Sequence, residues 1–196
     1  MIHTPTRTIK TAEERLQEIL DVAQAFFARK GYDATSIQDI IDEVGIAKGT
    51  FYHYFRSKSD LLDAVVDRMV EQGQAVMREV VEAPGLDALT KFRQVFLQAN
   101  SWKLQHQDFL IELLRVMYRP ENAILRDRLR SVSIEVTVPL LAAVVRQGVE
   151  EGVFDTEDPE EVVVIVLHIG QALSDTIAKA LLFGERDEEV ARQASH

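Results

Sequence analysis

The chain of 196 residues contains no cysteine. Disulfides, thiolate zinc sites and cysteine nucleophiles are therefore excluded together. Only five histidines are present to act as metal ligands or general bases. His106 and His168 lie far apart in the sequence, and neither belongs to an HExxH pattern or to a cluster of carboxylates. The sequence therefore predicts no catalytic site, no metal site and no resident cofactor, and an all-helical enzyme or metal protein is the weaker alternative.

Long hydrophobic runs are missing as well. No uncharged apolar stretch approaches the roughly 18 residues that a membrane span requires. Residues 1–10 lack the apolar core that a signal peptide needs. With 46% hydrophobic and 28% charged residues, the composition is that of a folded globular protein. The sequence predicts a cytoplasmic protein with no membrane partner.

An excess of positive charge, which neutralises phosphates in DNA-binding proteins, is absent from the chain as a whole. The formal net charge is −10. Residues 1–60 nevertheless hold eight Lys or Arg against nine Asp or Glu, a net of −1, which leaves −9 for residues 61–196. A near-neutral front part can present one basic face to DNA while the acidic remainder is held away from the phosphates. The charge balance therefore does not exclude nucleic acid.

Sustained alternation of apolar and polar residues, the sign of a half-buried strand, is absent, and almost every segment has helical periodicity. The predicted fold class is all-α. A first helix has one apolar stripe and ends at Gly31, as a C-terminal glycine allows. The stripe consists of Leu16, Ile19, Leu20, Ala23, Phe26 and Phe27.

Two short helices follow the first. Thr35 and Gln38 have the spacing of a capping box at the start of the second helix, whose apolar face ends at Val44. Gly45 then makes a tight turn into a third helix over Ala47–Phe55. Two short helices joined by a turn of three or four residues with a glycine are typical of the helix-turn-helix unit, whose second helix reads DNA.

The third helix separates polar from apolar residues. Ile46, Phe51 and Phe55 are placed to anchor it in a core. Gly49 lets the backbone approach a DNA groove closely. Ser57 and Asp60 are predicted to cap a fourth helix, and Lys58 at its entrance is predicted to hold a phosphate. The donors and hydroxyls on the polar face belong to Lys48, Thr50, Tyr52, His53 and Tyr54.

Residues 31–37 (GYDATSI), 44–55 (VGIAKGTFYHYF), Lys58 and the Leu61-Leu62 pair resemble the TetR family of bacterial repressors. The resemblance covers about residues 12–65 and fades beyond residue 70. It implies that Thr35 and Ser36 contact phosphate, and that Tyr54 and Lys58 hold phosphates. It also implies that the residues facing bases or the nearby backbone are Lys48, Gly49, Thr50, Tyr52 and His53.

Two positions depart from the family pattern. Ala47 stands where a Ser or Thr usually caps the recognition helix, so that cap is in doubt, at a cost of about 1 kcal/mol. Tyr54 stands where His is common, although a phenol can still donate to a phosphate. Structural readings stay open beside these roles: Tyr52 and Tyr54 could pack within the head, and Thr35 and Ser36 would cap a helix without DNA.

The rest of the chain is predicted to be a helical body. Pro84-Gly85 separates the fourth helix from a fifth at about 86–104, and Arg119-Pro120 follows a sixth at Asp108–Tyr118. A long seventh helix is expected over Glu121–Glu151, with a kink at Pro139.

Gly152 ends that seventh helix. Asp158 and Pro159 then start an eighth helix as its cap and first residue, with Glu161 three residues past the cap, and it extends to about Phe183.

The eighth helix is apolar on too much of its circumference for one core, so a second copy of the chain is expected to cover the excess. The resemblance implies dimerisation through a four-helix bundle of the last two helices of each chain. After Gly184 only Glu185–His196 remain, largely polar and scarcely long enough for a full ninth helix, so either the interface borrows the seventh helix or the chain has been trimmed. The predicted interface residues are Val162, Val166, Ile169, Leu173, Ile177 and Leu181.

Aromatic and polar residues in the presumed core of the body mark the place where the family has an effector pocket, although such residues are more often plain core. Ligand binding there would shift the fourth helix and change the spacing of the two heads. The predicted pocket residues are Phe92, Phe96, Trp102, Phe109, Met117, Tyr118, His168 and Gln171.

The sequence thus predicts three parts: a flexible N-terminal arm at 1–11, a helix-turn-helix domain at 12–60 and a helical effector-binding and dimerisation domain at 61–196. The predicted function is a homodimeric repressor that binds a palindromic operator in double-stranded DNA and is released by an unidentified small-molecule effector. Activation instead of repression stays open. An adaptor that uses the body to bind another protein and the head only to pack is a further alternative.

Overall fold

The computed structural model describes residues 11–193, apart from the side chains of residues 121, 124, 125, 128 and 184–193. Over the described range it contains α-helices, one short 3-10 helix and no β-strand, which confirms the all-α prediction. Residues 1–10 of the expected N-terminal arm lie outside the described residues. The chain divides into two compact units, Met1–Met69 and Val70–His196.

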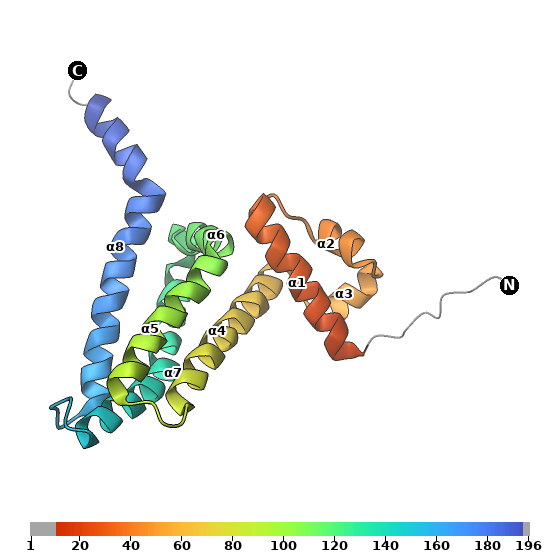
Figure 1. Cartoon of the computed structure of the whole chain (residues 1–196). Coiled ribbons are helices and arrows are strands. Elements are labelled where there is room, and N and C mark those ends of the chain that lie inside the picture. Colours follow the sequence, from red (N-terminus) through yellow and green to blue (C-terminus); the bar gives the residue numbers. More distant parts are fainter. Residues whose placement is uncertain (1–10, 194–196) are drawn as a thin grey trace. The chain divides into compact units, whose positions relative to one another are not determined.

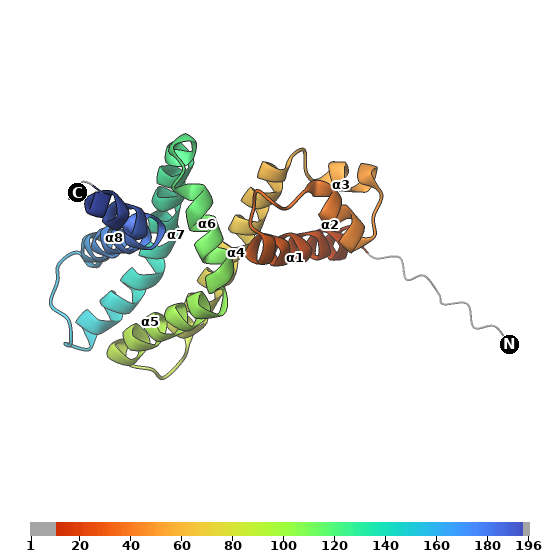
Figure 2. The same cartoon turned by 90° about the horizontal axis from the view of Figure 1, so that it is seen from above.

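The first unit contains α1 (Ala12–Lys30), α2 (Ile37–Val44), α3 (Lys48–Tyr54) and the beginning of α4 (Lys58–Glu82), as Figures 1 and 2 show. Its core is formed by side chains that are fully buried, and these come from all four helices. The fully buried apolar residues are Ile19, Ala23, Phe27, Ile40, Phe51, Leu61 and Val65.

The cap of α2 corrects the sequence prediction. Ser36, and not Thr35, is the N-cap residue: its side chain accepts from the backbone N–H of Asp39, and the Asp39 carboxylate accepts from the backbone N–H of Ser36. The Thr35–Gln38 capping box is therefore wrong by one residue. The Ser36–Asp39 pair has the same spacing, and packing decides between the two because Thr35 is fully buried. The predicted Ser57–Asp60 cap of α4 is confirmed.

The second unit contains the rest of α4, α5 (Ala88–Gln105), α6 (Gln107–Met117), α7 (Ala123–Glu150) and α8 (Pro159–Gln193). The short helix η1 (Pro120–Asn122) precedes α7, which therefore starts two residues later than predicted. Pro139 lies inside α7, and α7 and α8 run side by side (Figures 1 and 2). The core between α4, α5, α7 and α8 consists of Val80, Val95, Leu141, Ala142, Val145 and Val163.

The eighth helix continues beyond the predicted end near Phe183 to Gln193. Gly184 does not interrupt it. The residues after Gly184 therefore extend α8 as far as Gln193. Within the described residues they do not form a separate ninth helix.

Candidate nucleic-acid interface

Helix α3 is anchored on one side and exposed on the other. Phe51 is fully buried, and Phe55 just after the helix is 6% exposed. Tyr52, the next residue, is 45% exposed, and its ring meets the Phe51 ring edge-on with 5.5 Å between centroids. The apolar contacts thus fix the helix while a polar face stays accessible, as an element that enters a DNA groove requires.

The exposed side of α3 holds most of the residues that the sequence singles out. Lys48, Gly49 and His53 are exposed and Thr50 is half-buried. No atom beyond its chain neighbours and its own helix lies within 4 Å of a Cβ built on Gly49, so the backbone there is open to close approach. The structure brings Lys48, Gly49, Thr50, Tyr52 and His53 together on one short helix.

The start of α3 lacks a side-chain cap. Ala47 has the extended backbone of an N-cap residue, with φ −72° and ψ 148°, but no side-chain hydrogen bond. The doubt about this cap that the sequence raises is therefore confirmed.

Ser36 and Thr35 point in different directions although they are neighbours. Ser36 is exposed at the start of α2, and its hydroxyl oxygen accepts from Asp39, which leaves the hydroxyl proton available to a phosphate. Thr35 is fully buried, and its hydroxyl donates to the carbonyl oxygens of Gly31 at 2.8 Å and Phe26 at 3.3 Å. Only Ser36 of this pair presents its side chain to solvent.

The carboxylate of Asp39 helps to hold the α2 N-terminus. The hydrogen bond from the backbone N–H of Ser36 lowers the pKa of Asp39 below its ordinary value, and the Ser36 hydroxyl and the Lys30 ammonium act in the same direction. Lys30 Nζ lies 3.6 Å from the carboxylate. The sequence prediction missed this residue because it placed the cap one position earlier.

Tyr54 and Lys58 make contacts within the first unit. The Tyr54 hydroxyl donates to the carbonyl oxygen of Ala12 at 3.1 Å. The Lys58 ammonium donates to the carbonyl oxygens of Tyr32, Asp33 and Thr35. Both side chains are half-buried, so neither is presented as openly as Lys48 or His53.

Comparison with known proteins adds a second line of evidence. The family model "Bacterial regulatory proteins, tetR family" matches residues 19–65. This segment begins within α1 and ends within the first turns of α4. The helix-turn-helix segment of this chain is thus similar to that of the TetR family. The proteins that share this segment are transcriptional regulators and not enzymes.

Relatives of this chain are helix-turn-helix transcriptional regulators. The HTH-type transcriptional regulator YerO of Bacillus subtilis is 32% identical over 126 residues, which are 62% of this chain and 43% of YerO. The HTH-type transcriptional repressor KstR2 of Mycobacterium tuberculosis is 28% identical over 152 residues, 76% of this chain and 73% of KstR2. The chain therefore spans less than half of YerO.

A solved structure shares the fold. A transcriptional regulator from Cytophaga hutchinsonii superposes with a TM-score of 0.65 at 21% identity, over 83% of this chain and 81% of that one. The all-α plan with the helix-turn-helix unit at the N-terminus is thus that of solved regulators.

The predicted pocket residues fall into separate groups within the second unit. Phe92 contacts Phe96 and Phe154, with centroids 4.9 and 6.1 Å away. The Trp102 ring stacks on His106 at 4.5 Å. His168 is exposed, and its Nδ1 lies 2.8 Å from the carbonyl oxygen of Val164 one turn earlier. Phe109 and Met117 are buried on α6, whereas Tyr118 donates to Asp175 of α8 and Gln171 donates to Arg130 of α7.

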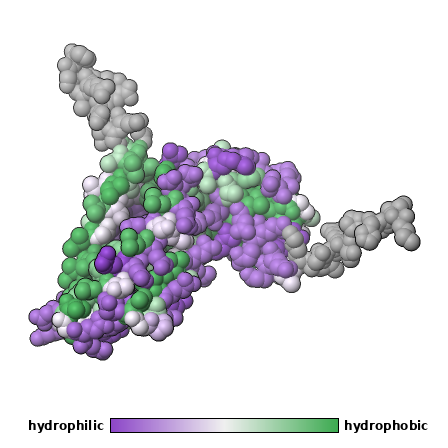
Figure 3. All heavy atoms as spheres, in the orientation of Figure 1, coloured by the Kyte–Doolittle hydropathy of each residue, from purple (hydrophilic) through white to green (hydrophobic). Residues whose placement is uncertain are grey.

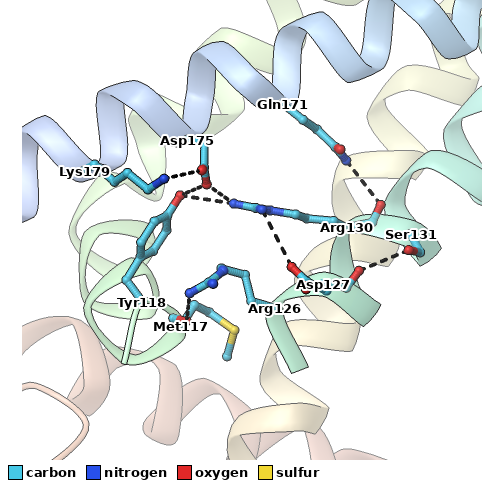
Figure 4. A network of polar contacts seen from close by, with 9 residues as sticks. All are labelled: Met117, Tyr118, Arg126, Asp127, Arg130, Ser131, Gln171, Asp175 and Lys179. Atoms are coloured by element: carbon cyan, nitrogen blue, oxygen red, sulfur yellow. Dashed lines mark hydrogen bonds and ion pairs between the residues drawn. The ribbon is translucent and has the colours of Figure 1, made fainter. Parts of the chain in front are cut away.

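Tyr118 and Gln171 belong to a polar network where the end of α6 meets α7 and α8 (Figure 4). The Tyr118 hydroxyl and the Arg130 guanidinium both donate to the Asp175 carboxylate. Lys179 Nζ lies 3.0 Å from the same carboxylate, and Gln171 donates to the Arg130 carbonyl oxygen at 3.2 Å. The sequence does not single out Arg130 or Lys179, since nothing in their spacing links them to Tyr118.

The six residues predicted for the dimer interface are all exposed in the single chain. They range from 37% exposed at Val162 to 70% at Leu181, and an apolar surface follows α8 in Figure 3. Two segments, Leu129–Glu150 and Pro159–Phe183, are long and apolar enough to cross a membrane by length and composition. One or two such helices are weak evidence, because core helices of soluble proteins pass the same test.

Proposed function

We propose that this protein is a cytoplasmic, homodimeric repressor that binds a palindromic operator in double-stranded DNA and is released by a small-molecule effector. The observation that carries the proposal is that α3 exposes its polar residues while Phe51 on the same helix is buried. The kinship with the repressor KstR2 supports the direction of regulation, and activation would show as an opposite effect on transcription.

The proposed DNA contacts divide by their exposure. Lys48, Thr50, Tyr52 and His53 are proposed to face base edges or the nearby backbone, with Gly49 allowing close approach. Ser36 is proposed to donate to a phosphate from the start of α2, and Tyr54 from the end of α3 once its hydroxyl leaves the Ala12 carbonyl.

The proposed dimer buries the apolar face of α8 against a second copy of α8. An exposed stripe of this kind favours association because each buried leucine contributes about 2 kcal/mol. A two-fold dimer would also place two heads on paired half-sites one helical turn of DNA apart, or a multiple of it. The effector is proposed to bind within the second unit, where Tyr118 and Gln171 tie α6, α7 and α8 together.

The test is binding to the promoter DNA beside the protein's own gene, measured across a salt series. Specific binding that weakens steeply with salt is expected, since each neutralised phosphate contributes about 0.9 to the slope of log K against log salt. Lys48→Met should lower the affinity more than Lys103→Met, which removes the same charge from the exposed side of α5.

Substitutions of Tyr52 distinguish a role in DNA binding from a role in packing. Tyr52→Ala should weaken specific binding, whereas Tyr52→Phe keeps the edge-on contact with Phe51 and reports on the hydroxyl alone. Loss of binding by Tyr52→Ala with an unchanged circular dichroism spectrum would exclude the adaptor alternative. Absence of binding by the wild type to any fragment in a genome-wide selection would overturn the proposal.

A further inference from the structure

Lys58, the first residue of α4, reaches across the first unit to the loop between α1 and α2. Its Nζ lies 2.8 Å from the carbonyl oxygen of Tyr32, 3.3 Å from that of Asp33 and 2.9 Å from that of Thr35. The ammonium also lies 4.4 Å from the centroid of the Tyr32 ring, within cation–π distance. The three acceptors precede Lys58 in the sequence by 23 to 26 residues.

This geometry uses all of the hydrogen-bonding capacity of the side chain. An ammonium group has three N–H donors and no acceptor. Three carbonyl oxygens already receive them, so a phosphate oxygen would have to displace at least one of these bonds. The contacts of Lys58 are those of a group that holds the protein's own backbone.

We propose that Lys58 is a positioning residue that fixes the α1–α2 loop, and with it the DNA-contacting Ser36, to the beginning of α4. The proposal rests on the proposed function, in which Ser36 contacts a phosphate. It replaces the phosphate contact that the resemblance implies for Lys58.

The loop is held from two sides. Lys58 takes the carbonyl oxygens of residues 32, 33 and 35 from the α4 side, while the buried Thr35 hydroxyl ties the loop to the carbonyl oxygens of Phe26 and Gly31 on the α1 side. Ser36 follows directly and begins α2. The place of its hydroxyl is therefore set by the two anchors just before it.

A second contact fixes α4 to the same unit three turns later. Arg68, whose side chain is 11% exposed, donates to the side chains of Gln17 at 3.1 Å, Asp21 at 2.7 Å and Gln24 at 2.8 Å on α1. The first three turns of α4 are thus held at both ends. Through Lys58 the beginning of α4 is thus tied to the loop that precedes Ser36.

The experiment compares Lys58→Met with Lys48→Met in two measurements. The first is amide hydrogen exchange without DNA, where the amides of Thr35, Ser36 and Asp39 should exchange faster in Lys58→Met and as in the wild type in Lys48→Met. The second is the salt series, where Lys58→Met should weaken binding roughly tenfold with an unchanged salt slope. A slope smaller by about 0.9 together with unchanged exchange would overturn the proposal.

A double-mutant cycle separates positioning from a general loss of structure. Ser36→Ala and Lys58→Met should lose less affinity together than the sum of the single losses, because both act on one phosphate contact. Additive losses would contradict the proposal. If Lys58→Met does not fold, Lys58→Arg keeps the charge but cannot direct its planar donors to three carbonyls that converge on one atom. Wild-type exchange in Lys58→Arg would overturn the proposal.

The same measurements distinguish a failure of this proposal from a failure of the proposed function. A wild type that binds no DNA fragment removes the proposed function and, with it, the role of Ser36. The hydrogen-exchange comparison needs no DNA, so it decides by itself whether Lys58 holds the loop.

Discussion

Thr35 and Ser36 illustrate how two adjacent hydroxyls acquire different tasks. The Thr35 side chain is buried under the α1–α2 loop and donates to two backbone carbonyls, whereas Ser36 caps α2 in contact with solvent. Threonine suits the buried position because its methyl group fills the core while its hydroxyl satisfies polar backbone atoms. The shape of the loop therefore depends on the residue whose side chain is buried.

Thr35→Val is expected to lower the free energy of unfolding by about 1–3 kcal/mol, since it removes the hydroxyl that pairs two buried carbonyls. Thr35→Ser keeps the hydroxyl and loses one methyl group, at a cost of about 1 kcal/mol. Urea unfolding measures both variants. A smaller loss in Thr35→Val than in Thr35→Ser would mean that the methyl group matters more than the hydrogen bonds.

Asp39 makes the free energy of unfolding of the first unit depend on pH. Its folded pKa lies below its ordinary value of 3.8, so its stabilising effect is present above that value and is lost as the pH falls through the folded pKa. The free energy of unfolding should fall on acidification, and less so in Asp39→Asn, which keeps an acceptor for the Ser36 N–H. Urea unfolding at pH 7 and pH 3 checks the difference, and NMR titration of Asp39 should place its pKa below the ordinary value. Parallel pH profiles for the two proteins would refute it.

At the scale of elements, α3 depends on packing more than on its own ends. It spans only Lys48–Tyr54, its N-cap Ala47 contributes no side-chain hydrogen bond, and Phe51 is its one fully buried side chain. Helices this short are marginal in isolation. The contact of Phe51 with the core is therefore what keeps the proposed recognition helix folded.

Ala47→Ser should stabilise the first unit by about 1 kcal/mol, because a serine hydroxyl can accept from an unpaired backbone N–H of the first turn. The backbone at Ala47 already has the extended conformation that a cap residue needs. Thermal unfolding measures the gain, and Ala47→Val, which has no hydroxyl, is the control. Equal melting temperatures for Ala47→Ser and Ala47→Val would show that the first turn is satisfied in another way.

At the scale of the whole molecule, α8 carries the apolar surface through which we propose that the chain dimerises. On its outward side, Ile169 is 65% exposed and Leu173 is 61% exposed, although both side chains are strongly apolar. Contact between water and such an apolar stripe is unfavourable. Packing against the same face of a second copy would remove the stripes of both chains from water. The proposed dimer would thus account for the long apolar face of α8.

Leu173→Asp should shift the protein from dimer to monomer, with a dissociation constant higher on the order of a thousandfold, since each dimer would lose two buried leucines. Leu97→Asp is the matched control, because Leu97 on α5 is 65% exposed. Sedimentation velocity measures the change.

The converse results identify the alternatives for this face. A dimer that Leu97→Asp breaks and Leu173→Asp does not would place the interface on α5. A monomeric wild type that binds lipid vesicles would assign the α8 face to a membrane.

The order and approximate bounds of the helices could be predicted from the sequence because helical periodicity, caps and breakers are local signals. Gly31 directly follows the end of α1, and Asp158 and Pro159 mark the start of α8. The missing cap at Ala47 is also visible from a single residue. Polar residues on α3 could be assigned for the same reason, because helical periodicity separates them from Phe51, which lies on the buried side of the helix.

Tertiary structure decided what each polar group contacts. Lys58 finds carbonyl oxygens at least 23 residues away, and the Tyr118 hydroxyl finds Asp175 57 residues away. It also decided that Thr35 turns inward and Ser36 outward, a choice that local propensity leaves open because both can cap a helix. The sequence by itself determined the all-helical plan, the helix-turn-helix unit and the family, since these depend on patterns within one or two turns. The partners of charged and hydroxyl groups depend on how distant helices pack, and only the folded chain brings them together.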